Sequence, residues 1–181
     1  MKDHLLIQDY QPKWRTQFLS IKKLLEGTLF GLDLYIEHVG STSVPGLAAK
    51  PIIDIDLVYK NTLDFKIIKD KLSQIGYSHK GNQEIPDREV FKRNNITQNK
   101  TLDTIIHHLY VCPHHSKELH RHILFRNHLR KHKDARAKYE NLKREIADKA
   151  HQHKKTYADL KETLAKEFIN SIIELEKKLQ L

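Results

Sequence analysis

The sequence predicts a single-domain α/β (α+β) protein that ends in a helical C-terminal region. A chain of 181 residues, 39% of them apolar, is long enough to bury one substantial core and too short for two comfortable domains. Short β-prone runs alternate with helical stripes over about residues 1–112, whereas only helical spacing follows. We therefore expect an α/β core over about residues 1–112 and C-terminal helices packed on it over about residues 113–181.

The first elements are predicted to be a helix, a strand, a loop and a strand. Apolar residues at helical spacing predict a helix over about residues 12–30. A β-prone run over residues 34–39 and a longer β-branched run over residues 51–59 predict two strands. The loop between them, residues 40–50, holds two glycines and three hydroxyl residues, and then a short helix-compatible piece.

The middle of the chain is predicted to be a helix followed by a sheet hairpin. An apolar stripe over residues 63–75 ends at a glycine, which is a common helix stop. A polar, turn-rich section covers residues 79–87. Residues 88–93 and 104–111 are predicted strands, separated by an Asn-rich loop over residues 94–100.

Three helices are expected after residue 113, each marked by apolar residues at helical spacing. The first contains Leu119, Ile123, Phe125 and Leu129, the second Tyr139, Leu142 and Ile146, and the third Leu160, Leu164, Phe168, Ile172 and Leu175.

Positive charge is concentrated in one stretch of the chain. The net charge is +9, and residues 114–155 hold 13 Lys and Arg against 5 Asp and Glu, together with eight of the 13 histidines. Such a stretch attracts polyanions, including nucleotides and RNA. The alternative is an ordinary solvated helix face rich in lysine and arginine.

Composition also indicates the compartment. The single cysteine, Cys112, can form no internal disulfide and no cysteine-based zinc site, which favours a reducing cytoplasm. Charges interrupt residues 1–14 after every few apolar residues, so that segment resembles neither a signal peptide nor a membrane span. We expect a soluble cytoplasmic protein without a membrane partner.

Two aspartates on the second predicted strand are candidate metal ligands. Asp54 and Asp56 project from the same face of a strand, because side chains alternate, and they interrupt an otherwise apolar surface. A divalent cation would relieve their repulsion, and oxygen ligands at this spacing suit Mg²⁺ or Mn²⁺ held with substrate phosphates. The alternative is a half-exposed strand with ordinary surface aspartates.

A glycine–serine turn precedes these aspartates. Gly40 lets the backbone approach a phosphate closely, and Ser41, Thr42 and Ser43 add hydroxyl donors beside backbone N–H groups. Gly-Ser turns are common, so the turn alone is weak evidence. The turn and the Asp-x-Asp strand in this order are much more specific than either feature separately.

The order strand, Gly40-Ser41, twelve residues, Asp54-Ile55-Asp56 resembles the signature of the nucleotidyltransferase superfamily, and residues 38–55 resemble the defining segment of the GrpB family. Further matches are Gly76-Tyr77, residues 108–111 (His-Leu-Tyr-Val), residues 125–130 (Phe-Arg-Asn-His-Leu-Arg), Tyr139, Leu142-Lys143, Tyr157 and Lys161. The resemblance implies a nucleotidyltransferase-like fold, a mixed sheet flanked by helices. A related domain is fused to dephospho-coenzyme A kinase in some bacteria.

The superfamily pattern supplies a third carboxylate that this chain does not show clearly. We expect His108, on the strand of residues 104–111, to lie nearest the two aspartates, as a third metal ligand or as a base. Glu89 is the carboxylate alternative. For His108, a strand histidine satisfied by hydrogen bonds is the competing interpretation.

Three basic residues are candidate phosphate ligands. Arg126 falls on the apolar stripe of its helix, so it should meet an anion, either an acid such as Glu89 or Asp87 or a substrate phosphate. Lys161 is expected in the same pocket, and Lys50 is either a solvated loop lysine or a triphosphate contact. Four histidines match no standard metal motif and are expected to be exposed on helices: His114, His115, His120 and His122.

These features predict a metal-dependent nucleotidyltransferase in which Asp54 and Asp56 hold the metal and the Gly40-Ser41 loop holds a nucleoside triphosphate. The basic region would suit a polyanionic acceptor, such as RNA or a nucleotide-containing metabolite. Two alternatives remain open. The protein could be a non-catalytic module that binds a nucleotide or a coenzyme A precursor, which a missing third carboxylate would favour. It could also bind nucleic acid through the basic helices of residues 114–155.

Overall fold

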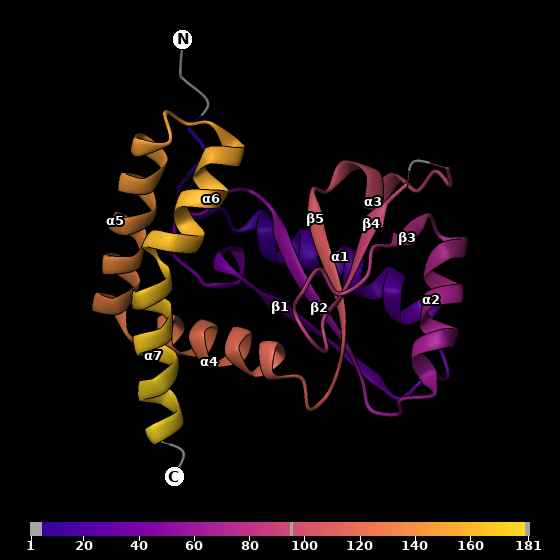
Figure 1. The fold of residues 1–181 in the computed structure, drawn as a ribbon. Helices are drawn as coiled ribbons and strands as arrows, with labels where there is room; N and C mark the ends of the chain where they lie inside the picture. The colour runs from indigo at the N-terminus through magenta and orange to yellow at the C-terminus, as the bar shows by residue number, and fades with distance from the viewer. Residues whose placement is uncertain (1–4, 95, 180–181) are drawn as a thin grey trace.

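The computed structural model describes residues 5–94 and 96–179 (Figure 1). A five-stranded sheet has the order β1-β2-β5-β4-β3. β2 and β5 run parallel, and the other neighbouring pairs are antiparallel, so the sheet is mixed as expected. The strands are β1 (Leu34–Val39), β2 (Ile53–Tyr59), β3 (Tyr77–His79), β4 (Glu89–Arg93) and β5 (His107–Pro113).

The helices lie on both sides of this sheet. In Figure 1, α5, α6 and α7 gather on one side of the molecule and α2 lies on the other, with the sheet between them. The helices are α1 (Lys13–Thr28), the short 3₁₀ turn η1 (Ser41–Ser43), α2 (Asp64–Gln74), α3 (Lys100–Thr104), α4 (Lys117–Lys131), α5 (Lys133–Lys149), α6 (Lys154–Leu164) and α7 (Lys166–Lys178).

One face of the sheet is apolar and packs on α1 and α2. Its contributors on β2 are Ile53, Ile55 and Leu57, all at most 1% exposed. The apolar stripe of α1 meets them, because Trp14, Phe18, Ile21 and Leu25 recur at helical spacing and are buried. This packing fixes which way β2 faces, and so directs Asp54 and Asp56 to the opposite face.

That opposite face, which we call the site face, carries polar groups on three adjacent strands. Residues that are partners across a sheet share a face. Asp54 is partnered by His108 of β5, and Asp56 is partnered by Glu37 of β1 and Tyr110 of β5. The site face therefore comprises Glu37, Asp54, Asp56, His108 and Tyr110.

A second apolar cluster attaches the C-terminal helices to the loop after β1. Val44, Leu47 and Ala48 of that loop are buried against residues of α4, α5 and α6, such as Leu129, Tyr139 and Tyr157. As a result, the C-terminal helices lie close to the beginning of this loop, at Gly40.

Most predicted elements are confirmed, with differences at some boundaries. The strand predicted over residues 104–111 begins at His107, because α3 occupies residues 100–104, and Tyr77–His79 forms an additional short strand. The predicted single helix around residues 160–175 is wrong: α6 ends at Leu164 and α7 begins at Lys166, with the buried Ala165 between them. Asn95, in the predicted Asn-rich loop, lies outside the described residues.

Within the described residues, every strand precedes residue 114 and the elements after it are helices. The division into a core and a helical part within one domain stays a prediction. Across the described ranges, no helix combines the length and the apolar character that a membrane crossing requires.

Candidate functional site

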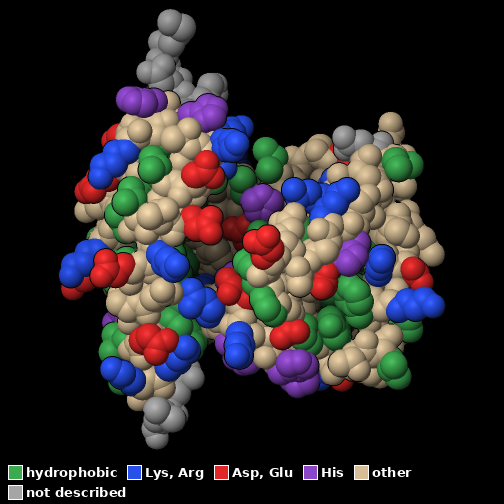
Figure 2. Space-filling model, in the orientation of Figure 1, with side chains coloured by type: hydrophobic (Ala, Val, Ile, Leu, Met, Phe, Trp, Pro, Cys, Tyr) green, Lys and Arg blue, Asp and Glu red, His purple; other side chains and the backbone are tan. Residues whose placement is uncertain are grey.

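A cleft of about 1010 Å³ separates the site face from the C-terminal helices. Figure 2 shows the surface hollowed between these two parts of the molecule, with acidic and basic side chains on the rim. The polar residues that line the cleft include Gly40, Ser41, Thr42, Lys50, Asp54, His108, Tyr110, Glu118, His122, Arg126, Lys143 and Lys161. Most of the residues predicted for the site are therefore brought together.

Gly40 lies against the carboxylate of Asp54. Its φ of +69° is a conformation that side chains rarely adopt, and a Cβ built on it would lie 2.2 Å from Asp54 Oδ2. Glycine is thus required here both by the backbone and by the space. The Asp54 carboxylate can sit directly beside the peptide that begins the loop.

The substitution Gly40→Ala should therefore disturb the site more than the fold. We expect a loss of stability of about 1–3 kcal/mol from the positive φ, together with displacement of the Asp54 carboxylate. Urea unfolding measures the first effect, and nucleotide titration measures the second. Gly81→Ala is a matched control, because Gly81 also has a positive φ but has open space around its Cβ position. Equal effects of the two substitutions on ligand binding would contradict the role of the close approach.

The hydroxyls of the loop have different uses from those predicted. Thr42 Oγ1 donates to Ile52 O and Ser43 Oγ donates to Gly40 O, at 3.0 and 2.6 Å, so both brace the loop itself. Ser43 does not line the cleft, and its predicted phosphate contact is wrong in this arrangement. Ser41, half-buried at the cleft, is the loop residue best placed to offer a hydroxyl.

Asp54 and His108 form a pair on neighbouring strands. His108 Nδ1 lies 2.9 Å from Asp54 Oδ1, and the histidine side chain is 51% exposed. The structure places His108 beside the first aspartate, as expected. Its role as a ligand or as a base stays a prediction.

Asp56 is buried beneath a histidine of α4. His122 Nδ1 donates to Asp56 Oδ2 at 2.7 Å, and its Nε2 lies 3.3 Å from Glu118 Oε1. Burial alone would lower the pKa of His122, but the hydrogen bonds to Asp56 and Glu118 raise it to about 10. His122 is therefore an imidazolium at neutral pH. The prediction that it is an exposed helix histidine is wrong.

The two aspartates fit a divalent cation. Asp56 Oδ1 is buried and has no hydrogen-bond partner among the described residues, and Asp54 Oδ2 occupies the space that a side chain at residue 40 would fill. The unpaired Asp56 oxygen could accept a cation, and Asp54 uses Oδ1 for its hydrogen bond with His108, which leaves Oδ2 as its second possible ligand atom. Asp56 itself is only 1% exposed, so it would meet a cation from beneath the surface of the cleft.

Arg126 points inward as predicted, and its acid is Glu37. Arg126 Nη1 donates to Glu37 Oε2 at 2.5 Å and to His38 O at 2.9 Å. The predicted alternatives, Glu89 and Asp87, are wrong as partners. Glu37 is the third carboxylate of the site face, opposite Asp56, and Arg126 balances its charge.

Glu89 cannot serve as the third metal ligand in this fold. It pairs with Val111 across the sheet and so lies on the face opposite to Asp54 and Asp56. Its carboxylate contacts His79 Nε2 at 2.5 Å instead. Strand alternation across β4 and β5 decides this outcome.

The lysines that line the cleft include Lys50, Lys143 and Lys161. Burial and the charges of Lys154 and Lys161 lower the pKa of Lys50, so Lys50 is not a freely solvated loop residue. The pKa of Lys161 is raised mainly by Tyr139, whose effect exceeds the lowering caused by burial. Tyr157 and Asp54 raise this pKa further. The buried Lys143 donates to Ala48 O, and burial together with Lys161 lowers its pKa to about 7.

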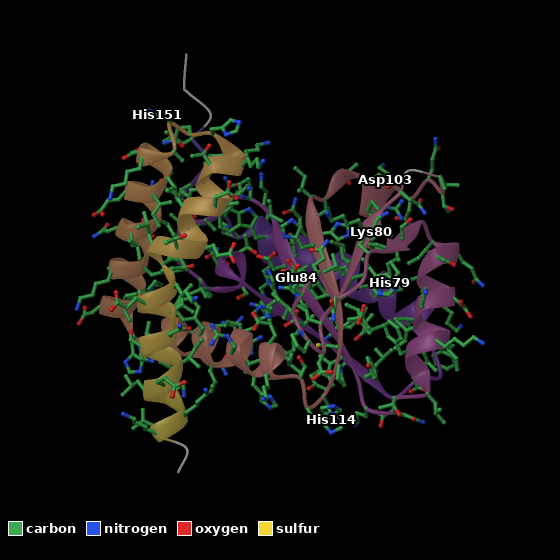
Figure 3. The ribbon with its side chains drawn as sticks, in the orientation of Figure 1. His79, Lys80, Glu84, Asp103, His114 and His151 are labelled. Carbon is green, nitrogen blue, oxygen red and sulfur yellow. The ribbon has the colours of Figure 1, made fainter. Side chains whose placement is uncertain are left out.

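The remaining histidines of the basic stretch are not gathered in one place, although the rings of His128 and His132 lie beside each other. His114, His115 and His120 are exposed as expected, but His114 and His115 lie in the turn before α4 and not on a helix. Figure 3 shows His114 and His151 at well-separated positions on the molecule. The stretch therefore forms no single histidine cluster.

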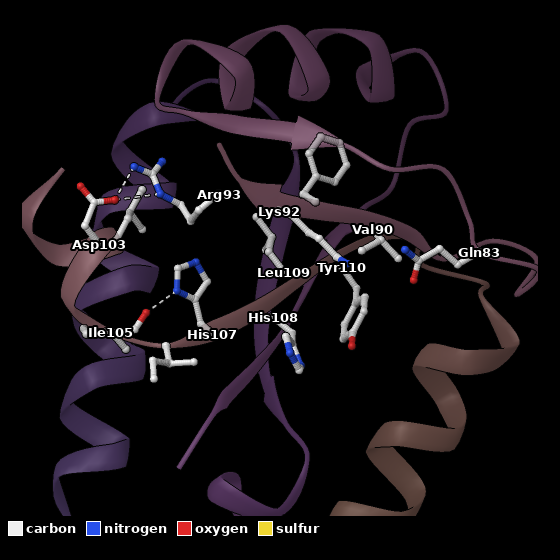
Figure 4. A pocket seen from close by; sticks show the side chains of 13 residues that line it. Gln83, Val90, Lys92, Arg93, Asp103, Ile105, His107, His108, Leu109 and Tyr110 are labelled. Carbon is white, nitrogen blue, oxygen red and sulfur yellow. Dashed lines mark hydrogen bonds and ion pairs between the residues drawn. The ribbon is translucent and has the colours of Figure 1, made fainter. Parts of the chain in front are cut away.

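A second hollow, of about 560 Å³, adjoins the cleft along β4, α3 and β5 (Figure 4). His108 and Tyr110 line both spaces. On its other side, His107 Nδ1 donates to Ile105 O at 2.7 Å, and Arg93 pairs with Asp103. The hollow thus offers a second approach to the Asp54–His108 pair.

His38 makes the stability of the protein depend on pH. Thr42 Oγ1 donates its hydrogen bond to Ile52 O, so it must accept from the ring Nε2 of His38, 3.1 Å away. The His38 ring also stacks on Phe18. Burial, outweighing the charge of Asp54, lowers the pKa of His38 to about 4.

Because the unfolded chain takes up this proton near pH 6.5 and the folded chain does not, stability is lost as the pH falls below 6.5. We expect about 1.5 kcal/mol of this loss between pH 6.5 and pH 5, and His38→Gln should remove that part of the dependence. Urea unfolding at several pH values measures it. An unchanged slope in the variant would contradict the assignment.

Comparison with known proteins identifies the family. The family model described as GrpB protein matches residues 4–174. The chain belongs to the GrpB family. It is 34% identical to a UPF0157 protein of Streptomyces coelicolor, over 86% of this chain and 77% of that one. It is 30% identical to the glutamate-rich protein GrpB of Alkalihalophilus pseudofirmus, over 94% and 97% of the two chains.

Solved structures agree with this family and confirm the fold. The conserved protein GrpB from Enterococcus faecalis superposes with a TM-score of 0.75 at 28% identity, covering 93% of this chain and 97% of that one. A mutant of the Cid1 poly(U) polymerase bound to MgATP superposes with a TM-score of 0.57 at 12% identity, over 85% of this chain and 50% of that one. At that identity the likeness shows the nucleotidyltransferase-like fold of this GrpB-family chain.

Proposed function

We propose that this GrpB-family protein binds a nucleoside triphosphate with Mg²⁺ or Mn²⁺ in the cleft and transfers its nucleotidyl group to an acceptor hydroxyl. The observation that carries the proposal is the close approach of Gly40 to the Asp54 carboxylate at a cleft that also collects Lys50 and Lys161. An anion-binding loop and a carboxylate thereby face the same space as two cationic side chains.

Some of the cationic side chains would bind the phosphates, and another holds the loop in position. Lys50 and Lys161 line the cleft and would contact the phosphates. Arg126 is engaged by Glu37 and holds the end of β1, so its part is to position Gly40. Ser41 adds a hydroxyl to the loop. A bound divalent cation, held by Asp54 and Asp56, would supply neutralisation of the negative charge on the phosphates.

His108 is the group best placed to accept the proton of an acceptor hydroxyl. With Nδ1–H donating to Asp54 Oδ1, its Nε2 is the free basic atom. The side chain is half exposed and lines the second hollow as well as the cleft. An acceptor that enters through this hollow would reach His108 without displacing the triphosphate.

The polyanionic acceptor, RNA or a nucleotide-containing metabolite, rests on the charge of residues 114–155. Proteins that share this fold include an RNA terminal U-transferase, which superposes with a TM-score of 0.55 at 13% identity over 80% of this chain and 44% of that one. This likeness concerns the fold, so the acceptor is a proposal from charge alone.

The second candidate function is binding of a nucleotide or a coenzyme A precursor without turnover. It is favoured by the engagement of the site carboxylates, because Arg126 holds Glu37 and His122 holds Asp56. Apart from Asp54, the carboxylates that line the cleft among the described residues are Glu118, which contacts His122 and Arg121, and the exposed Glu162. Both lie on helices, α4 and α6, and neither lies on the strands that carry Asp54 and Asp56.

Calorimetric titration of nucleoside triphosphates and coenzyme A precursors, with and without Mg²⁺, tests the proposal. Triphosphate binding that requires the metal is the expected result. Incubation with RNA and with small hydroxyl acceptors, followed by mass spectrometry, then separates transfer from binding without turnover. Absence of binding of both nucleoside triphosphates and coenzyme A precursors, with Mg²⁺ and with Mn²⁺, would refute both functions and leave the basic helices as the functional surface.

A further inference from the structure

A cluster of three potential metal ligands lies where the end of α4 meets α7, apart from the cleft. His128 is in the last turn of α4, His132 joins α4 to α5, and Glu176 is near the end of α7. One ligand atom from each residue lies within 4.8 Å of the others. Among the described residues this is the one group of three histidine, cysteine or carboxylate ligands so closely placed.

The fold already holds these side chains together. His128 Nδ1 lies 2.6 Å from Glu176 Oε1, and both side chains are largely buried, at 7% and 12% exposed. The rings of His128 and His132 lie 4.2 Å apart between centroids. The backbone N–H of His132 donates to His128 O at 2.9 Å, so the helical turn continues and puts both rings on one side.

We propose that His128, His132 and Glu176 bind one Zn²⁺ ion, with water in the fourth position on the exposed side of His132. Two imidazole nitrogens and one carboxylate oxygen are a ligand set that suits zinc, whereas Mg²⁺ and Ca²⁺ prefer oxygen ligands. Tetrahedral ligands about 2.0–2.1 Å from zinc lie about 3.4 Å from one another. The observed cluster therefore needs side-chain movements of about 1 Å, with no change of helix packing.

The ion would act as a structural clip between α4 and α7. At the other end of this helix pair, Arg121 Nη2 donates to Asn170 Oδ1 at 2.9 Å. Both helices line the cleft, α4 through His122 and Arg126 and α7 through Asn170 and Ile173. A clip at residue 176 would fix the far end of α7, and so would hold one wall of the cleft.

Titration of Zn²⁺ into chelator-treated protein without an affinity tag tests this site. We expect one ion per chain, and a rise in Tm of about 5–10 °C at a hundredfold excess over Kd. His132→Asn and Glu176→Gln should each weaken binding at least tenfold. His132 is exposed and makes no side-chain cap, and glutamine keeps the size of Glu176, so neither substitution should unfold the chain.

His151→Asn is the matched control. His151 is an exposed histidine with φ of +47°, a conformation that asparagine tolerates, and it lies outside the cluster. This variant should bind Zn²⁺ like the wild type. Asp54→Asn should also leave Zn²⁺ binding unchanged, which separates this site from the metal proposed for the cleft.

Three results would overturn the proposal. The first is no saturable binding of Zn²⁺, in which case His128 and Glu176 form a helix-packing contact alone. The second is wild-type affinity in both His132→Asn and Glu176→Gln. The third is loss of Zn²⁺ binding in Asp54→Asn or displacement of Zn²⁺ by excess Mg²⁺, which would assign the ion to the cleft.

Discussion

Asp54→Asn is expected to remove the Mg²⁺-dependent part of nucleoside triphosphate binding while the protein stays folded. The Asp54 side chain is 29% exposed at the cleft, and it pairs with the half-exposed His108, so little packing depends on its charge. An amide keeps the shape beside Gly40 but loses the negative charge that holds a divalent cation. We expect a loss of about 3 kcal/mol, or about a hundredfold in Kd.

Calorimetry with and without Mg²⁺ measures this effect, and thermal unfolding verifies the fold. Asp33→Asn is a matched control, because Asp33 is an exposed aspartate paired with Lys60 away from the cleft. Wild-type, metal-dependent affinity in Asp54→Asn would contradict the placement of the metal.

Asp56→Asn should differ from Asp54→Asn because Asp56 supports His122. Removal of its charge leaves a buried imidazolium with Glu118 as its remaining acid, which should lower Tm as well as ligand binding. The two aspartates are equivalent in the sequence pattern but differ in burial. Only the docking of α4 over β2 creates this difference.

Local patterns in the sequence were sufficient to predict the parts of the site that lie close together in the chain. Gly40, Ser41 and the Asp54–Asp56 pair belong to one strand–loop–strand unit, and strand alternation fixes the direction of the aspartates. His108 could be placed beside them because its strand carries a recognisable family segment. Gly40, Ser41, Asp54 and His108 therefore line the cleft, whereas Asp56 lies buried beneath its surface.

Groups that reach the site from distant segments could not be predicted from local patterns. His122 is separated by 66 residues from Asp56, and Arg126 by 89 residues from Glu37. Their pairing depends on the register of β1 with β2 and on how α4 packs, and neither follows from helical spacing alone. Glu89 was misplaced for a related reason, since the face of β4 depends on its register with β5.

The break between α6 and α7 has the same physical origin. Apolar residues keep a helical spacing across residues 160–175, so the pattern alone predicts one continuous helix. Ala165 is fully buried in the cluster that joins the C-terminal helices to the loop after β1. Tertiary packing, rather than a glycine or proline, ends α6 at this point.

Arg126→Met is expected to destabilise the protein by about 3 kcal/mol and to lower Tm by about 6–12 °C. The guanidinium is 9% exposed and donates to Glu37 and to His38 O, so its removal leaves the Glu37 carboxylate opposite Asp56 without a balancing charge. Methionine keeps much of the apolar volume, which limits the effect to charge and hydrogen bonds.

The double variant Glu37→Gln/Arg126→Met separates these causes. Neutralising Glu37 removes the unpaired carboxylate, so the double variant should recover more than half of the stability lost in Arg126→Met. Urea unfolding at pH 7 measures all four members of this double-mutant cycle. A free energy of unfolding of Arg126→Met within about 0.5 kcal/mol of the wild type would contradict the structural role of Arg126, since surface substitutions typically fall within that range. A double variant no more stable than Arg126→Met would instead assign the loss to the bond with His38 O.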